Sequence, residues 1–379
     1  MGRCIVNLPG KTRCSEEKSS NQSNLSDISV LAFTKYADKA ASTRQRLLLY
    51  QEYLRERGIG ITWQPLLENE YLERFSRGQT SPRTKIALSY AKRLGQLLRQ
   101  KNFDILWVQY ELFPYLPAAF ERLAFLTGKP VLCDYDDAIF HMYDSHKNKA
   151  VRWLLARKLE TLLRGSSACS CGNKYLRAYA KRYCNNSVII PTVVDTTVFF
   201  PAKNGARRRV TVGWIGSPST WRYVTPLSVL LSHIAQSNNT NIKVVGAGSK
   251  AKKVPGIQFL EWIQEAEVSV IQTMDIGIMP LPNEPWAWGK CGYKLIQYMA
   301  CGLPVVASPV GVNCEIIQHG ENGFLASSEK EWAEALDVLI RNPELRSKMG
   351  SAGRAKVEAH YSLKAHAPRV EALLRSMVR

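Results

Sequence analysis

Short apolar runs alternate with amphipathic segments along most of the chain. The runs are rich in Val, Ile and Leu, which is typical of strands buried on both faces of a sheet. We predict strands at Ile28–Phe33, Ile59–Trp63, Ile105–Gln109, Val131–Cys133, Ser167–Ser170, Val188–Ile190, Val210–Ile215, Lys243–Gly246, Ile257–Phe259, Ile276–Met279 and Val305–Ser308.

The segments between these strands carry apolar residues at helical spacing. We predict helices at Thr43–Arg57, Ser81–Gln100, Lys149–Leu163, Asn173–Lys181, Val224–Ala235, Tyr293–Ala300, Glu329–Arg341, Pro343–Gly350, Ala352–His360 and Ser362–Val378. Strands that alternate with helices form βαβ units and parallel sheets. A length of 379 residues suits two domains. The predicted fold class is therefore α/β, with two Rossmann-like, doubly wound parallel-sheet domains.

The predicted domain boundary lies just after Pro201, where a polar and basic segment, Ala202–Arg209, has the composition of a linker. Residues 27–201 form the first predicted domain and residues 202–361 the second. Residues 1–26 are rich in Ser, Asn and Lys, and we predict a mobile tail.

The stretch around Lys290 carries the strongest candidate chemistry. A strand, Ile276–Met279, is followed by a Pro- and Trp-rich loop, Pro280–Gly289, that we expect to be neither helix nor strand. Lys290 and Gly292 then open a helix, and Lys294 shares a helical face with Lys290. A helix N-terminus beside two lysines suits an anion with several oxygens, such as a diphosphate. Solvated surface lysines are the alternative, and placement between two glycines favours the anion site.

Other polar residues follow predicted strands of the second domain. Gly216 and Ser217 lie after Val210–Ile215 and form a small, hydroxyl-rich cradle for an oxyanion. Glu284 is the acid nearest to Lys290 in the preceding loop.

The first domain offers candidates for a second substrate. Arg44 and Arg46 lie in the predicted first turn of a helix, where positive charge opposes the helix dipole. They either meet an acidic or phosphorylated group or are tolerated surface arginines. Glu111 follows another predicted strand.

Three aspartates, Asp134, Asp136 and Asp137, crowd the end of Val131–Cys133. Their mutual repulsion should raise the pKa of at least one of them. They suit a general base or a hydroxyl-orienting group, and aspartates also bind divalent cations. Asp137 fits the N-terminal cap of the next helix as well.

The chain carries 51 Lys and Arg against 32 Asp and Glu, a net charge of +19. The excess is +12 in residues 1–200 (30 against 18) and +7 in residues 201–379 (21 against 14). Such a balance implies an anionic partner: nucleic acid, acidic lipid or a phosphorylated substrate. The sequence has no nucleic-acid-binding motif. The basic amphipathic helix Ser81–Gln100, with Lys85 and Arg93, either lies on a membrane surface or packs its apolar side on the sheet.

The nine cysteines have no zinc-site spacing; Cys169 and Cys171 are the closest pair. Reduced thiols in a cytoplasmic protein are the simplest interpretation. Met1–Lys18 lacks the apolar core of a secretory leader. The uncharged stretch Leu295–Asn313 contains two glycines and two prolines, so we interpret it as sheet core rather than a membrane span.

The run Tyr298–Ser308, with Gly311, Glu315, Gly320 and Asn322–Leu325 after it, resembles the donor-binding region of retaining glycosyltransferases of family 4. The resemblance implies the GT-B fold, in which two Rossmann-like domains face each other across a cleft and the last helix, here residues 362–378, crosses back to the first domain. It also implies a nucleotide-sugar donor, no metal or other cofactor, and work at the inner face of a membrane, where acidic lipid is the favoured surface partner.

Two glutamates separated by seven residues are usual in that family. Their positions fall on Gly289 and Gln297 in this chain. Gln297 can still hydrogen-bond a ribose hydroxyl. The family also has an Arg and a Lys after the first strand of the second domain; Arg222 is present and the Lys is not. With these departures the chain resembles a divergent branch of the family, in which Lys290 and Lys294 contact the phosphates.

We therefore expect a glycosyltransferase that moves a sugar to a glycan or lipid-linked acceptor, in cell-surface polysaccharide biosynthesis. Lys290, Lys294 and Asp136 are the expected catalytic residues. The expected donor-binding residues are Gly216, Ser217, Glu284, Gly292, Gln297, Gly311 and Glu315, and those on the acceptor side are Arg44, Arg46, Glu111 and Asp134. A nucleotide-sugar epimerase, a non-catalytic glycan- or anion-binding module and, third, a nucleic-acid binder are the alternatives.

Overall fold

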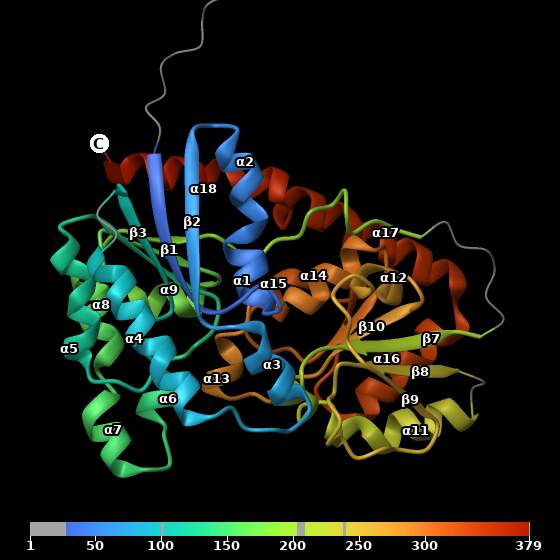
Figure 1. Ribbon diagram of the computed structural model, residues 1–379. Helices are drawn as coiled ribbons and strands as arrows, with labels where there is room; N and C mark the ends of the chain where they lie inside the picture. Colours follow the sequence, from blue (N-terminus) through green and yellow to red (C-terminus); the bar gives the residue numbers. More distant parts are fainter. Residues whose placement is uncertain (1–27, 100–101, 203–208, 238–239, 379) are drawn as a thin grey trace, which may run out of the picture.

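The computed structural model describes residues 28–99, 102–202, 209–237 and 240–378 (Figure 1). The predicted tail, residues 1–26, lies outside the described residues, as do residues 203–208 of the predicted linker. Two sheets lie side by side, each with its own helices (Figure 1). We call them, with their helices, the first and the second lobe. The predicted α/β class with two doubly wound parallel sheets is confirmed.

The first lobe is built on six parallel strands in the order β2-β1-β3-β4-β5-β6. Every residue of β3 and β4 is buried, as expected when helices cover both faces. The strands are β1 (Ile28–Tyr36), β2 (Ile59–Leu67), β3 (Ile105–Gln109), β4 (Val131–Tyr135), β5 (Ala168–Cys171) and β6 (Ser187–Ile189).

The second lobe has six parallel strands in the order β12-β11-β10-β7-β8-β9. The order reverses between β7 and β10, and ligands of doubly wound sheets lie beyond the carboxyl ends of the strands at such a point. The strands are β7 (Thr211–Ile215), β8 (Asn241–Val245), β9 (Ile257–Leu260), β10 (Ile276–Met279), β11 (Val305–Ala307) and β12 (Gly323–Leu325).

Two predicted helices of the first lobe are each interrupted. Thr43–Arg57 becomes α1 (Ala41–Arg46), the 3-10 helix η1 (Leu48–Tyr50) and α2 (Gln51–Arg55), because Leu47 leaves helical geometry at φ −129° and ψ −63°. Lys149–Leu163 becomes α7 (Lys149–Leu155) and α8 (Lys158–Gly165). The other helices are α3 (Asn69–Ser76), α4 (Arg83–Arg99), α5 (Ala118–Glu121), η2 (Arg122–Thr127), α6 (His141–Asp144) and α9 (Lys174–Ala180).

The helices of the second lobe differ from the prediction at several places. Predicted Val224–Ala235 becomes a 3-10 helix and an α-helix, and three short helices, Pro218–Trp221, Glu267–Ile271 and Asn313–Ile316, were not predicted. The Pro- and Trp-rich loop contains a short helix, α13 (Pro285–Trp288), because Pro fits the first helical position, where its missing N–H is not needed. The two helices predicted on either side of Ser351 form one, α17 (Pro343–His360). The remaining helices are α10 (Pro218–Trp221), η3 (Thr225–Leu227), α11 (Ser228–Ser237), α12 (Glu267–Ile271), α14 (Tyr293–Ala300), α15 (Asn313–Ile316) and α16 (Glu329–Arg341).

Gly350 does not end a helix, contrary to the prediction, but lies within α17, where it allows close packing. A Cβ atom at this position would lie 2.0 Å from the carbonyl oxygen of Gly302, just after α14. The missing side chain therefore lets α17 approach α14 closely.

The last helix, α18 (Leu363–Val378), contacts η1, α2 and β3 of the first lobe. It runs along the top of the first lobe in Figure 1. Val370 and Leu374 are buried in the same apolar cluster as Tyr50 and Trp107, and Glu371 pairs with Arg57 at 3.4 Å. Within the described part of the chain, no helix is long and apolar enough to cross a membrane.

Candidate active site

The loops that follow the strands of the two sheets meet between the lobes. Asp136 and Asp137, after β4, contact the segment Gly289–Cys291 of the second lobe. Asn173, after β5, donates to the carbonyl oxygens of Trp288 and Lys290 at 3.2 and 3.0 Å. The structure therefore brings the predicted lysine segment and the predicted aspartate cluster together.

An ion pair joins Lys290 to Asp137. The Nζ of Lys290 lies 2.6 Å from Oδ2 of Asp137, and the side chains are 20% and 22% exposed. Burial lowers the pKa of Lys290, but the nearby carboxylate of Asp137 outweighs it, so the pKa is raised above its ordinary value. The second carboxylate oxygen of Asp137 accepts from the backbone N–H of Ala138 at 3.1 Å. Asp137 therefore meets both a cation and a neighbouring backbone N–H. The prediction that it caps the next helix is wrong, because α6 (His141–Asp144) has Phe140 at its N-cap.

Lys294 lies in the first turn of α14, whereas Lys290 lies before the helix, on the other side of Gly292 with its left-handed backbone. The prediction that the two lysines share a helical face is therefore wrong. Burial, and then the charge of Lys290, lower the pKa of Lys294 to about 8. Its Nζ lies 5.8 Å from the centre of the Trp214 ring, and it makes no ion pair with any described residue. Two amines thus share one carboxylate, and an added anion would stabilise the charged form of Lys294.

The start of α14 depends on Gly292, whose φ of +69° suits glycine. A Cβ atom there would lie 2.2 Å from Cδ1 of Ile316. One turn later, Gln297 is 2% exposed, and its Nε2 has no hydrogen-bond partner among the described residues. A buried amide without a partner is costly, so this donor is available to a ligand or a water molecule.

Gly289 lies against the first lobe. A Cβ atom at Gly289 would lie 2.4 Å from Cβ and 2.7 Å from the backbone nitrogen of Ala138. The glutamate that family 4 enzymes usually carry at this position would therefore collide with Ala138 in this arrangement of the lobes.

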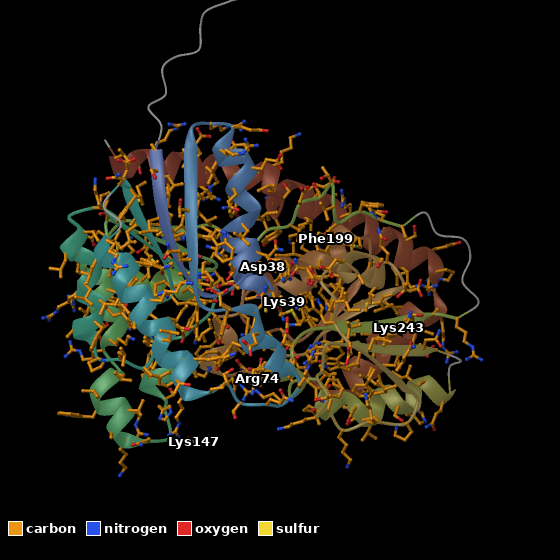
Figure 2. All side chains as sticks on the ribbon, viewed as in Figure 1. Asp38, Lys39, Arg74, Lys147, Phe199 and Lys243 are labelled. Atoms are coloured by element: carbon orange, nitrogen blue, oxygen red, sulfur yellow. The ribbon has the colours of Figure 1, made fainter. Side chains whose placement is uncertain are left out.

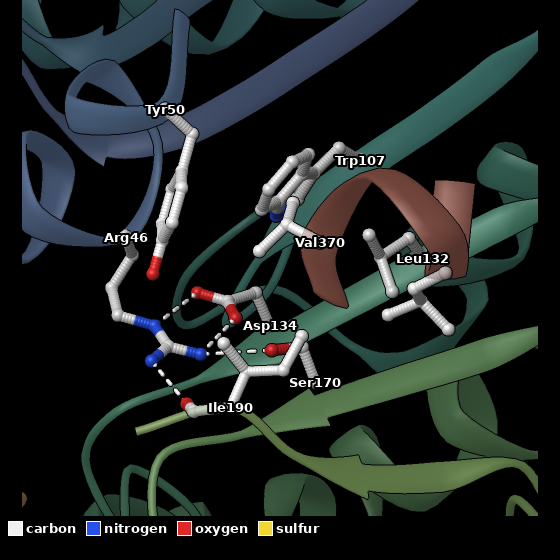
Figure 3. A pocket seen from close by; sticks show the side chains of 9 residues that line it. Arg46, Tyr50, Trp107, Leu132, Asp134, Ser170, Ile190 and Val370 are labelled. Carbon is white, nitrogen blue, oxygen red and sulfur yellow. Dashed lines mark hydrogen bonds and ion pairs between the residues drawn. The ribbon is translucent and has the colours of Figure 1, made fainter. Parts of the chain in front are cut away.

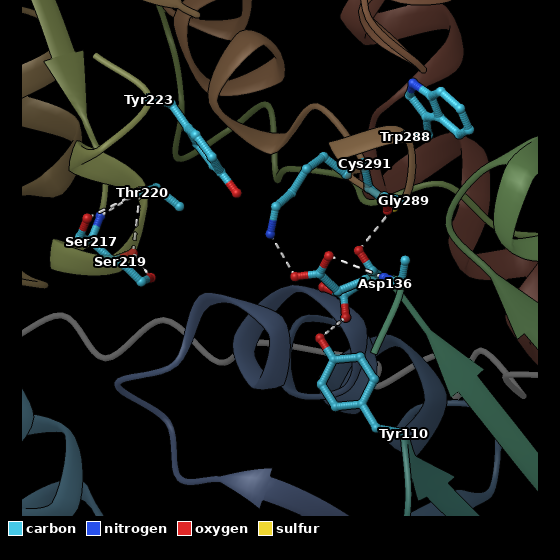
Figure 4. A network of polar contacts seen from close by, with 12 residues as sticks. Tyr110, Asp136, Ser217, Ser219, Thr220, Tyr223, Trp288, Gly289 and Cys291 are labelled. Carbon is cyan, nitrogen blue, oxygen red and sulfur yellow. Dashed lines mark hydrogen bonds and ion pairs between the residues drawn. The ribbon is translucent and has the colours of Figure 1, made fainter. Parts of the chain in front are cut away.

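The loop after β7 adds exposed hydroxyl groups. Ser217 precedes α10, and its Oγ lies 2.9 Å from Oγ of Ser219, while its N–H donates to Thr220 at 3.1 Å. Arg222 donates to the hydroxyl of Tyr223 at 3.0 Å. Figure 4 shows that hydroxyl directed toward the polar network around Asp136.

Gly216 precedes this loop; a Cβ atom there would lie 2.3 Å from the Trp214 ring, so the residue allows close packing. Glu284 stands at the N-cap of α13 without a side-chain capping bond. The pKa of Arg222 is raised, first by its hydrogen bond to Tyr223 and then by the charge of Glu284. The Glu284 carboxylate therefore lies near this loop.

Asp136 accepts a short hydrogen bond from the hydroxyl of Tyr110, and its backbone carbonyl accepts from the thiol of Cys291 at 3.2 Å (Figure 4). Burial raises the pKa of Asp136 to about 6; Arg46 opposes this rise and Asp134 adds to it. The predicted pKa increase is thus present, but burial contributes more than repulsion within the cluster. Tyr110 adopts φ +66°, a rare backbone conformation for a non-glycine residue.

The prediction that Arg46 and Asp134 face an acceptor is wrong. Their side chains are 2% and 1% exposed and form an ion pair with Nε–Oδ2 and Nη2–Oδ1 distances of 3.1 and 2.6 Å (Figure 3). Arg46 also donates to Ser170 and to the carbonyl oxygen of Ile190. The space between these groups and α18 leaves no volume for a water molecule. The pair joins α1 to the sheet from within.

The prediction for Glu111 is also wrong. Its carboxylate is fully buried, 2.8 Å from Nζ of Lys158, and the Tyr143 hydroxyl donates to it, with its oxygen 2.9 and 2.7 Å from the two carboxylate oxygens. Lys158 also lies 3.0 Å from Glu121, which accepts from the backbone N–H groups of Leu112 and Phe113. This buried network holds the loop after β3 in place and is closed to an acceptor.

Helix α4 packs on the first lobe through Arg93 and Leu97, which are buried. Arg93 donates to the carbonyl oxygens of Leu112 and Gln64 at 3.1 and 3.0 Å. Lys85 pairs with Glu70 at 2.9 Å. These contacts agree with the packing alternative.

Two other predicted ligand residues connect the lobes. Arg44 lies 3.6 Å from Glu267, and its guanidinium lies 5.1 Å from the centre of the Trp262 ring. Glu315, on α15, pairs with Lys174 of α9 at 3.0 Å. Gly311 has φ +55° and packs on the backbone of Trp288.

Sequence reasoning missed Tyr110 and Tyr223 as members of the site and named Asp137 only as part of the cluster. The positive φ of Tyr110 has no sequence signal, because tyrosine does not favour it. Among the described residues, no three His, Cys, Asp or Glu side chains are grouped to hold a metal ion, and each of the described cysteines is a free thiol.

Part of the chain is similar to known glycosyltransferases. Residues 209–342 match the family model described as "Glycosyl transferases group 1". An uncharacterised glycosyltransferase of Haemophilus influenzae is 32% identical over 130 residues, which cover 31% of this chain and 35% of that protein. The matches cover about a third or less of the curated relatives.

Solved structures share the fold over nearly the whole chain. Anabaena HepE in complex with UDP-glucose has a TM-score of 0.70 at 14% identity and covers 92% of this chain and 100% of its own. Sucrose-phosphate synthase of Thermosynechococcus elongatus has a TM-score of 0.68 at 15% identity and covers 92% of this chain and 98% of its own. The chain therefore has the GT-B fold, and its residues 209–342 match the model of the group 1 glycosyl transferases.

Proposed function

We propose that the protein transfers a sugar from a nucleoside-diphosphate sugar to a hydroxyl group of an acceptor. The observation that carries the proposal is the pair Lys290 and Lys294 at the start of α14, which shares the single carboxylate of Asp137. A diphosphate placed here gives Lys294 the counter-ion it lacks. The family match over residues 209–342 supports the same activity.

In this proposal the lysines stabilise the negative charge that develops on the leaving diphosphate, an electrostatic effect that is usually a large part of catalysis. Gln297 and Glu284 bind the ribose or the donor sugar. The unpaired Nε2 of Gln297 supports this role, because a ribose hydroxyl would satisfy it. Ser217 and Gly216 lie at the neighbouring strand end, and Gly292, Gly311 and Glu315 shape the loops around the donor.

Asp136 is the proposed general base. With a pKa of about 6 it is mostly ionised at neutral pH and can take the acceptor's hydroxyl proton. The acceptor oxygen then bonds to the anomeric carbon of the sugar, and the bond from that carbon to the phosphate oxygen breaks, so the nucleoside diphosphate leaves with both electrons. Retention of the anomeric configuration is part of the proposal through the resemblance to family 4.

We propose a glycan or a lipid-linked acceptor, in cell-surface polysaccharide biosynthesis, with the protein in the cytoplasm and in peripheral contact with acidic lipid at the inner face of a membrane. No metal ion or other cofactor is required in this account. HepE was solved with UDP-glucose, so uridine nucleotides are the first donors to test. The comparisons favour neither the epimerase nor the binding-module alternative.

The test is release of nucleoside diphosphate from UDP-glucose, UDP-N-acetylglucosamine and GDP-mannose, with and without a membrane extract as acceptor. One donor should be consumed in an acceptor-dependent reaction, and Lys290→Ala/Lys294→Ala should lose it. The control, Lys330→Ala/Lys348→Ala, removes two lysines from α16 and α17 of the same lobe. Formation of an epimeric sugar without acceptor would indicate the epimerase, and binding without any turnover would indicate the binding module.

A further inference from the structure

Helix α7 exposes two large apolar side chains at the end of the first lobe. Trp153 is 87% exposed and Leu154 is 52% exposed. Trp153 is the most exposed of the large hydrophobic residues in the described part of the chain. Leu155 is buried and holds α7 against the lobe. Trp153 and Leu154 therefore point outward from an ordered helix.

Three cations accompany them. Lys147, Lys149 and Arg152 form no ion pair with any described acid, and Arg152 donates to the carbonyl oxygens of His146 and Lys147 at 2.5 and 3.3 Å. Figure 2 shows Lys147 projecting from the lower end of the lobe. We call residues 147–154 the basic tip.

The acids nearest to the basic tip in sequence are already occupied. Asp144 lies 3.0 Å from Nδ1 of His141, and Glu160 lies 3.2 Å from Arg157. The tip therefore carries a local charge of +3 from Lys147, Lys149 and Arg152, with two apolar side chains among them.

The basic tip is continuous with the site. The chain runs from Asp136 and Asp137 through α6 directly into α7, which contacts α6 (Figure 1). Tyr115, 51% exposed, lies edge-on against Tyr143 of α6, with ring centres 5.6 Å apart. A surface that contacts the tip would therefore lie at the far end of the segment that begins at Asp136, the proposed base.

These features fit the interface of a lipid bilayer. Tryptophan has an apolar body and a polar N–H, which suits the boundary between head groups and acyl chains. Lysine and arginine stems extend along apolar surface while their charges reach anionic head groups. A stable protein interface buries about 1,200 Å² or more, which two side chains on a seven-residue helix do not supply.

We propose that the basic tip docks the protein on an anionic lipid bilayer, with Trp153 and Leu154 entering the interface and the three cations meeting acidic head groups. This placement deepens the membrane contact of the proposed function by assigning it to α7 and the residues just before it. It rests on that proposed contact, and it does not depend on sugar transfer.

The test is co-sedimentation with vesicles of phosphatidylcholine with or without phosphatidylglycerol. The full chain should bind only the anionic vesicles, and added salt should weaken binding. Trp153→Ser/Leu154→Ser and Lys147→Gln/Lys149→Gln should each reduce binding at least about tenfold, because the first loses apolar burial and the second loses two contacts with anionic head groups. Leu88→Ser on α4, where the leucine is 70% exposed, is the matched control and should bind as wild type does.

Nucleotide binding by the same variants separates this proposal from the enzymatic one, because the tip variants should bind nucleotide normally. The proposal is overturned if wild type ignores anionic vesicles or if the tip variants sediment with them as wild type does. It is also overturned if Trp153→Ser/Leu154→Ser converts an oligomer to a monomer without lipid, since the tip would then be a self-association surface.

Discussion

At the scale of single residues, Asp136 and Asp137 are adjacent but have different partners. Asp136 accepts from Tyr110 of its own lobe, whereas Asp137 pairs with Lys290 of the other. The ammonium group of Lys290 has three N–H donors, so it can keep its contact with Asp137 and still donate to a phosphate. We therefore interpret Asp137 as the group that holds Lys290 in position for an anionic ligand.

The raised pKa of Asp136 predicts a pH effect on activity. If Asp136 is the base, kcat/KM of wild type should fall as the pH drops below about 6, where the carboxylate is protonated. Asp136→Asn should lower activity by about 10²–10⁴-fold and lose this pH dependence. Rates measured from pH 5 to 8 on both proteins check this, and an unchanged acid limb in the variant would assign the base elsewhere.

The same pKa predicts a stability effect of defined sign. An unfolded aspartate titrates at about 3.9, so the folded chain holds the Asp136 proton more tightly. Between these two pH values, a rise in pH therefore costs wild type stability that Asp136→Asn does not lose. Urea unfolding of both proteins at pH 4.5 and 6.5 gives the difference, and a variant that loses as much stability as wild type would contradict the assignment.

The buried network around Lys158 predicts a large loss of stability. Lys158→Met leaves the carboxylates of Glu111 and Glu121 buried without their cation, which should lower the free energy of unfolding by about 3–5 kcal/mol. The control Lys330→Met changes a lysine that is 85% exposed and should stay within about 0.5 kcal/mol of wild type. A loss below about 1 kcal/mol for Lys158→Met would contradict the network's role.

Sequence reasoning succeeded where a residue's environment follows from its position on one element. Lys294 and Gln297 follow from the start and period of a single helix, α14, whereas Lys290 lies before it. Sequence reasoning failed for Arg46, on a predicted helix, and for Asp134 and Glu111, near predicted strand ends. Neither position says whether a charged side chain turns toward solvent or inward to a partner on a distant element.

At the scale of elements, α14 was predicted with its observed bounds, Tyr293–Ala300, and so was α16, Glu329–Arg341. Both begin after strong local signals and keep a clear apolar face. Helix α1 ended early because Arg46 turns into the core to meet Asp134, and α17 continued because Gly350 packs on Gly302. These two outcomes depend on contacts between elements, which periodicity does not report.

The close contact of Gly289 with Ala138 predicts an effect on the arrangement of the lobes. Gly289→Ala places a Cβ atom 2.4 Å from that of Ala138, so the lobes should separate and the radius of gyration from X-ray scattering should rise. Gly95→Ala on α4 meets nothing within 4 Å and should instead stabilise the protein by about 0.5–1 kcal/mol without a change in size. An unchanged radius in Gly289→Ala would show that the contact is easily relieved.

At the scale of the whole molecule, two parallel sheets were predictable because βαβ alternation has few alternative topologies. Their mutual arrangement was not, since it depends on side-chain pairs such as Lys290–Asp137, Arg44–Glu267 and Lys174–Glu315. These pairs bring loops from both sheets to one place, and α18 returns from the second lobe to cover the first.

The most direct test of the central claim is a thermal-shift panel of nucleoside diphosphates and nucleotide-sugars. One nucleotide series should stabilise wild type, by about 2.7 kcal/mol at a hundred times its dissociation constant. Lys290→Ala/Lys294→Ala should lose this ligand-induced shift, and Lys330→Ala/Lys348→Ala should keep it. If no nucleotide shifts wild type at millimolar concentration, or if the Lys290/Lys294 variant responds as wild type does, the donor site does not lie at these lysines.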